Sequence, residues 1–144
     1  MGIFDFVKEA GEDLLERVSG KAGSEGIRKS IHDQGLQVDD LQVEVEGDVA
    51  TVRGRTASQA EREKAILVAG NTKGVARVSD AIEVAKPEPE STYYEVKKGD
   101  TLGAIAKAHY GDASKYPQIF EANRPMLKDP DRIYPGQVLR IPPA

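Results

Sequence analysis

The sequence predicts an α+β protein made of two small domains. In residues 21–85, short runs of alternating apolar and polar residues flank a helical stretch, in the order helix, strand, strand, helix, strand. Residues 92–144 give a second pattern, strand, helix, helix, strand. A polar stretch with two prolines, residues 86–91, separates the two patterns and is typical of a linker. We therefore expect a three-stranded sheet with helices on one face, followed by a separate strand–helix–helix–strand domain.

Residues 1–20 are expected to form a helical segment that packs on the first domain. Apolar residues recur at roughly helical spacing from Ile3 to Val18. Gly11 predicts a break in this helix, because glycine in a helix interior costs about 1 kcal/mol relative to alanine. The alternative is a helix on a membrane surface, but five acidic and only two basic side chains over residues 3–18 would repel anionic lipid. The Ser- and Gly-rich residues 19–24 are expected to be a flexible connector.

Turn and cap residues define the elements of the first domain. Gly47-Asp48 predicts a tight turn between two strands. Ser58 and Glu61 have the spacing of a capping box at the start of a helix. Ile27 and Ile31 mark a short helix that Gly35 ends. The strands are expected over residues 41–46, 49–54 and 75–84, and the long helix over 58–69.

The second domain has equally clear boundaries. The turn Gly99-Asp100-Thr101 offers a helix N-cap, and Gly111 a helix end, so a helix is expected over 101–110. A second helix is expected to begin near Ser114, with Ser114 as its cap. Pro135-Gly136 predicts the turn into the last strand, around residues 138–141.

Motifs in both halves resemble known domain families. The motifs Y-x-V-x-x-G-D-T-L-x-x-I-A, I-F-x-A-N and I-x-P-G-Q-x-L-x-I-P resemble the LysM domain. The hairpin L-x-V-x-V-E-G-D-V-A-T-V-R-G and the helix A-E-R-E-K-A-I-L-V-A-G resemble the BON domain. The first resemblance implies binding of glycans that contain N-acetylglucosamine, such as peptidoglycan and chitin. The second implies association with membranes of the cell envelope.

The chain as a whole resembles the family of bacterial cytoplasmic potassium-binding proteins. The N-terminal G-x-F-x-F-V-K-x-A-G-E and the C-terminal E-A-N-x-P-M-L-K-x-P-D-x-I-Y-P-G-Q-V-L-R-I-P strengthen this resemblance. It implies selective binding of K⁺, with rubidium or caesium as substitutes, by a monomer whose two domains come together when the ion binds. The implied role is a cytoplasmic potassium sensor or buffer.

Potassium is a hard cation, so its ligands are expected to be oxygen atoms, and backbone carbonyls are a known means of selecting it. Carbonyls at helix ends lack partners within the helix and carry partial negative charge. The break at Gly11 and the helix end at residues 70–74 are two such places, although both glycines are also explained as a helix break and a C-cap. By resemblance, the donors are the carbonyls of Val7, Ala10, Glu12, Gly70, Thr72 and Val75.

Glycan binding by the LysM-like domain stays open as the alternative function. The groove implied by that family lies between the first strand–helix turn and the segment before the last strand. Its residues here are Gly99, Asp100, Thr101, Leu102, Met126, Ile133 and Tyr134. These positions also build the fold. A membrane-associated BON adaptor is a third possibility.

Composition argues against other function classes. A net charge of −4 disfavours nucleic-acid binding, and the absence of cysteine excludes disulfides and thiolate metal sites. The two histidines, His32 and His109, lie in different domains, and no motif of a hydrolase or nucleotide-binding loop occurs, so we do not expect an enzyme. The first residues lack the basic and apolar regions of a signal peptide and no stretch could span a bilayer, so we expect a cytoplasmic protein without stable membrane association.

Overall fold

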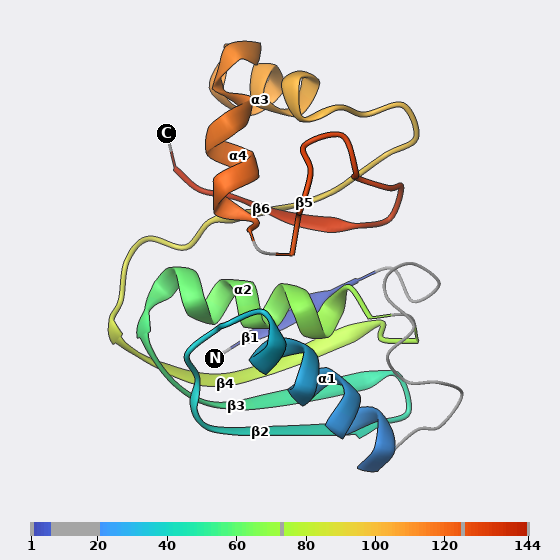
Figure 1. Ribbon diagram of the computed structural model, residues 1–144, viewed down its shortest axis with the longest axis vertical. Helices are drawn as coiled ribbons and strands as arrows, with labels where there is room; N and C mark the ends of the chain where they lie inside the picture. The colour runs from blue at the N-terminus through green and yellow to red at the C-terminus, as the bar shows by residue number, and fades with distance from the viewer. Residues whose placement is uncertain (1, 7–20, 73, 125, 144) are drawn as a thin grey trace.

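The computed structural model describes residues 2–6, 21–72, 74–124 and 126–143. They form an α+β structure with two sheets, as predicted (Figure 1). Elements β1 to β4 with α1 and α2 are called the N-terminal unit, and the remaining elements the C-terminal unit. The elements are β1 (Gly2–Asp5), α1 (Lys21–Asp33), β2 (Asp39–Glu46), β3 (Val49–Ser58), α2 (Gln59–Gly70), β4 (Arg77–Lys86), β5 (Thr92–Glu95), α3 (Leu102–Tyr110), the 3₁₀ turn η1 (Ala113–Lys115), α4 (Tyr116–Ala122) and β6 (Val138–Ile141).

The sheet of the N-terminal unit has four strands in the order β1-β4-β3-β2. The hairpin β2–β3 is antiparallel, as predicted, and turns at Gly47, where φ is +62°. Strand β4 runs parallel to β3, with α2 as the crossover between them. Both helices cover one face of this sheet, as expected from the sequence (Figure 1).

The fourth strand, β1, corrects the expected helix at the start of the chain. Residues 2–5 pair antiparallel with β4, and Phe4 lies opposite Val78. The exposure of the side chains alternates along this segment. Ile3 and Asp5 are exposed, whereas Phe4 and Phe6 are half-buried against the core. This period of two is that of a strand. Residues 7–20, where the rest of the helix was expected, lie outside the described residues.

Strands β3 and β4 run on to Ser58 and Lys86, beyond the expected ends at 54 and 84. Two helix starts also differ from those expected. Helix α1 begins at Lys21, inside the predicted connector, because Ser24 is buried and its hydroxyl accepts a hydrogen bond from the Val45 N–H at 3.0 Å. In the C-terminal unit, Asp112 rather than Ser114 is the cap. Its carboxylate accepts from the Ser114 N–H at 2.9 Å and starts the 3₁₀ turn before α4.

The other predicted caps are confirmed. Of the predicted capping box at the start of α2, the Ser58 half is formed, since the Ser58 hydroxyl accepts from the Glu61 N–H at 3.2 Å. The Glu61 carboxylate accepts from the Gln37 N–H at 3.0 Å. The Thr101 hydroxyl accepts from the Ala104 N–H at 3.0 Å at the start of α3, and Gly111 ends that helix in the left-handed conformation. Such caps satisfy backbone groups that have no partner within the helix.

Helix α2 lies between the two sheets (Figure 1). The C-terminal unit pairs β5 with β6, with α3 and α4 on the far side of this ribbon, and β6 contacts α2. Nine of the twelve residues of α2 are buried, including the charged Arg62 and Glu63. Such a helix has no polar face, which is typical of a helix covered on both sides.

Candidate functional site

The end of α2 brings three of the predicted carbonyl donors into one short turn. Gly70 is the last residue of α2, and Thr72 and Val75 are fully buried. The Val75 N–H donates to the Thr72 carbonyl at 3.0 Å. The Thr72 hydroxyl donates to the Val68 carbonyl at 2.9 Å, so the side chain already has a partner on α2.

Phe6 connects the N-terminal segment to this turn. Its N–H donates to the Ala76 carbonyl at 2.9 Å, directly after Val75. Its ring lies so close to Gly70 that a Cβ on this glycine would overlap it. The contact explains why glycine is needed at the end of α2. The remaining predicted donors lie outside the described residues, so their position stays a prediction; they are Val7, Ala10 and Glu12.

Asn71 connects the same turn to the C-terminal unit. Its Oδ1 accepts from the Val138 N–H at 2.8 Å, and its Nδ2 donates to the Val138 carbonyl at 2.7 Å. Asn71 is 6% exposed, so water has little access to these bonds. The pair of bonds copies the pattern of an antiparallel strand neighbour. Asn71 therefore occupies the edge of β6 that faces away from β5.

A second asparagine completes this edge. Asn123, at the end of α4, accepts from the Arg140 N–H at 2.8 Å and donates to the Arg140 carbonyl at 2.9 Å. An unpaired strand edge is prone to pair with other chains. Here one side chain from each unit covers it, and Asn71 can do so only when the units are docked.

An ion pair joins the middle of α2 to β6. Arg140 Nε donates to Glu63 Oε1 at 2.8 Å, and Glu63 is fully buried. Glu63 Oε2 accepts from Gln59 Nε2 at 2.9 Å and from the Ser91 N–H at 3.1 Å. Burial alone would raise the pKa of Glu63, but the hydrogen bonds from Gln59, Ser91 and Arg140 outweigh it and hold this pKa below its usual value. The carboxylate is thus ionised at neutral pH and tied to the C-terminal unit.

Strand β1 also takes part in this interface. The Phe4 ring contacts the Tyr93 ring of β5, with centroids 5.0 Å apart. The Arg62 guanidinium lies 6.0 Å from the Phe4 centroid and bonds both to Asp80 on β4 and, at 3.1 Å, to Glu90 before β5. Burial would lower the pKa of Arg62, but Asp80 and Glu90 raise it above its usual value. Strand β1 therefore contacts the C-terminal unit as well as pairing within its own sheet.

The residues of the predicted glycan groove have structural roles in the C-terminal unit. Asp100 accepts from the Tyr94 hydroxyl at 2.5 Å and from the Lys97 N–H at 2.8 Å, within its own turn at Gly99. Thr101 caps α3. Leu102 lies in the core of this unit and Ile133 packs against it. Met126 and Tyr134 line a cleft that faces α1 and α2.

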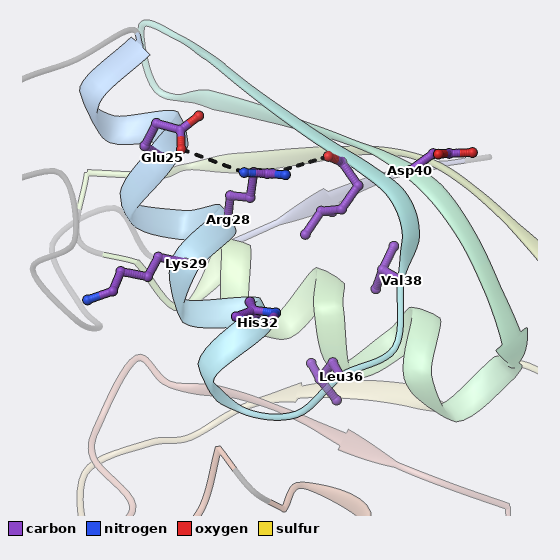
Figure 2. Close-up of a pocket in the computed structure, with 8 residues that line it drawn as sticks. Glu25, Arg28, Lys29, His32, Leu36, Val38 and Asp40 are labelled. Atoms are coloured by element: carbon purple, nitrogen blue, oxygen red, sulfur yellow. Dashed lines mark hydrogen bonds and ion pairs between the residues drawn. The ribbon is translucent and has the colours of Figure 1, made fainter.

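A separate groove of about 700 Å³ lies between α1 and β2 (Figure 2). Arg28 lies in it, with Nη1 3.8 Å from Glu25 Oε2 and Nε 3.4 Å from the Leu41 carbonyl. His32 stands near Leu36 at one end (Figure 2). Among the described residues, no three His, Asp or Glu side chains gather to hold a metal ion. His109 lies in the last turn of α3, and its ring contacts that of Tyr94.

Sequence reasoning missed the residues that hold the two units together. Glu63 lies in the charged run E-R-E-K, which suggests a solvated face. The signal that could have revealed it is the run A-I-L-V-A that follows, which is apolar around the whole helix and so predicts cover on both sides. Asn71 carries no comparable signal, because its partner Val138 is 67 positions away.

Comparisons with known proteins agree with both domain resemblances. Family models match the LysM domain at residues 94–142 and the BON domain at residues 24–86. The chain is 46% identical over 147 residues to the potassium binding protein Kbp of Escherichia coli, covering 99% of each protein. It is 35% identical to an uncharacterized protein of Deinococcus radiodurans, over 96% of this chain and 58% of that protein.

One further match is partial. The chain is 51% identical over 53 residues to an esterase of Mycobacterium tuberculosis, and this covers 37% of the chain but only 11% of the esterase. In the described residues no helix is long and apolar enough to cross a membrane. The match to the Escherichia coli protein covers both domains and the segment before them. The chain therefore belongs to the family of Kbp, in which a BON domain precedes a LysM domain.

Proposed function

We propose that this protein binds potassium ions selectively and serves as a cytoplasmic potassium sensor or buffer rather than as an enzyme. The observation that carries the proposal is the 46% identity, over nearly the full length, to a protein named for potassium binding. Identity at this level extends across both domains. The ion is the ligand, and rubidium or caesium replaces it.

The ion is held by backbone carbonyls from two segments. The proposed donors are those of Val7, Ala10, Glu12, Gly70, Thr72 and Val75. Two observations support this. Gly70, Thr72 and Val75 share one buried turn, and Phe6, next to Val7 in sequence, contacts both sides of that turn. A helix C-terminus also carries partial negative charge that suits a cation.

Ion binding orders the N-terminal segment and favours the docked units. Asn71 supports this step, since it lies between two proposed donors and bonds to β6. Strand β1 supports it as well, because Phe4 contacts Tyr93 while Phe6 contacts Gly70. An ion that binds only the ordered segment shifts the population towards the compact, monomeric state.

Thermal melting in potassium, rubidium and sodium chloride at equal ionic strength tests the proposal. The melting temperature should rise with potassium and rubidium, following RT ln(1 + [K⁺]/Kd), about 2.7 kcal/mol at 100 times Kd. Sodium is too small for six carbonyls and should have much less effect. Small-angle scattering should give a radius of gyration near ~15 Å in potassium and a larger one in sodium. Superimposable potassium and sodium curves would rule the proposal out.

Glycan binding is separated from this function by one measurement. A glycan-binding protein of the envelope would cosediment with peptidoglycan and show no preference among monovalent cations. An adaptor at the membrane would instead cosediment with lipid vesicles. Potassium-selective stabilisation without either cosedimentation supports the sensor.

A further inference from the structure

We propose that a cleft between the two units binds a small phosphorylated sugar. The cleft has a volume of about 310 Å³. Its wall includes Ser30 of α1 and Gln34 directly after that helix, and the segment before β6 contributes Lys128, Arg132 and Gln137. Pockets of about this size hold small organic ligands. The cleft lies beside the turn at the end of α2 that carries three proposed potassium donors, and Asn71 of that turn lines it.

The charge of the cleft favours an anion. Among the described residues that line it are Lys128 and Arg132 but no Asp or Glu, in a chain whose net charge is −4. Both side chains are exposed, and within the described ranges neither makes an ion pair. The nearby Asp129 is used in its own turn, where its carboxylate accepts from the Asp131 N–H at 2.8 Å. Two such cations suit a phosphate group, which carries close to two negative charges and can accept a bidentate bond from arginine.

The cleft is also lined by two glutamines whose amide oxygens lack a hydrogen-bond donor. Among the described residues, the buried atoms Gln34 Oε1 and Gln137 Oε1 have no partner. They are two of only three such side-chain atoms in the part of the chain that the structure describes. Gln137 is 3% exposed, and leaving a buried acceptor unpaired costs about 1–3 kcal/mol. A ligand that brings hydroxyl groups to these oxygens would remove that cost.

These two features together specify the ligand. The phosphate meets Lys128 and Arg132, and sugar hydroxyls donate to the amide oxygens of Gln34 and Gln137. Inorganic phosphate would leave the two amide oxygens without a donor, and an uncharged sugar would leave the two cations without an anion. Since the wall comes from both units, the ligand binds the docked arrangement.

Isothermal titration of the full chain in potassium chloride tests this site, with glucose 6-phosphate, inorganic phosphate and glucose as probes at constant ionic strength. Glucose 6-phosphate should bind at least tenfold more tightly than either other probe. The double variant Lys128→Gln/Arg132→Gln should lose at least tenfold in affinity for it. Lys107→Gln, which removes an exposed charge from α3 on the same domain, should bind as the wild type does.

The amide side is tested by Gln34→Met. This variant should lower the affinity for glucose 6-phosphate severalfold. It should leave the weaker affinity for inorganic phosphate unchanged. The proposal is overturned if glucose 6-phosphate does not bind, if inorganic phosphate binds equally well, or if the double variant binds like the wild type. Potassium-dependent melting of the same variants is measured in parallel. It should persist in all of them, so a failure of this site and a failure of the potassium proposal give different results.

Discussion

Replacing Gly70 with alanine tests whether potassium binding requires the contact between the N-terminal segment and the end of α2. The added Cβ would overlap the Phe6 ring, which then has to leave its place. Phe6 also donates its N–H to the Ala76 carbonyl, so a displaced ring disturbs the backbone on both sides of the turn. The proposed donor Val7 follows Phe6 directly. The Gly70→Ala substitution should therefore abolish ion binding without touching any carbonyl group.

The expected cost in stability is modest. Burying a whole phenylalanine side chain stabilises a protein by about 1.5–3 kcal/mol, and Phe6 is half-buried, so losing its packing costs about 1 kcal/mol. Strain from overpacking adds about 1 kcal/mol, while alanine is preferred over glycine in a helix by up to about 1 kcal/mol. The net loss of roughly 1–2 kcal/mol is smaller than the 5–15 kcal/mol that is typical of a folded domain. The variant should stay folded.

Gly103→Ala is the matched control. Gly103 lies within α3, and a Cβ there meets nothing closer than 3.9 Å. This variant should be slightly more stable than the wild type and keep its potassium response. Melting curves of the wild type and both variants in potassium and sodium chloride decide the matter. A Gly70→Ala protein with the full potassium shift would refute the role assigned to the Phe6 contact.

The interface predicts three other effects. Asn71→Ala leaves the buried N–H and carbonyl of Val138 without partners, which costs about 1–3 kcal/mol for each group. The melting temperature should therefore fall and the radius of gyration should rise. An unchanged radius of gyration would contradict the role of Asn71 in docking. The pKa of Glu63 is held below its usual 4.5 in the folded state, so its contribution is present above about pH 4.5 and is lost as the pH falls through the lower folded pKa. Unfolding titrations should thus show a smaller loss of stability in acid for Glu63→Gln than for the wild type. Tyr93→Phe removes a buried hydroxyl that has no partner among the described residues, and urea unfolding should show a gain of about 1 kcal/mol rather than a loss.

Local signals in the sequence predicted most of the fold because their physical cause is local. Ser58 and Glu61 are three residues apart and cap α2 through a bond between those same two residues. Thr101 and Gly111 bound α3 for similar reasons. The alternation in β2 and β3 reflects one face on the core, which a short window of sequence contains in full.

Short segments and distant contacts could not be predicted in this way. Ile3, Phe4 and Phe6 fit either a helix or a strand over so few residues, and pairing with β4 decides between them. Glu63 and Arg140 are 77 positions apart, and nothing near either residue indicates the other. All six donors of the ion site could be proposed only by resemblance, because a carbonyl is present at every residue and leaves no mark on the sequence.

Helix α2 gives a physical reason for coupling the ion to the domain arrangement. Gly70 and Thr72, two proposed donors, flank Asn71, whose side chain forms part of the β6 edge. Ordering this turn around an ion therefore orders a contact with the other domain through adjacent residues of the backbone, and no long pathway is needed.

The sugar-phosphate cleft requires the same docked arrangement and shares Asn71. Coupling between two binding sites is reciprocal, so potassium should raise the affinity for glucose 6-phosphate by the same factor by which glucose 6-phosphate raises the affinity for potassium. Titrations of each ligand with and without the other measure both factors. A shared factor greater than one would support coupling through the docked arrangement, and a factor of one would show that the two ligands do not share a docking equilibrium.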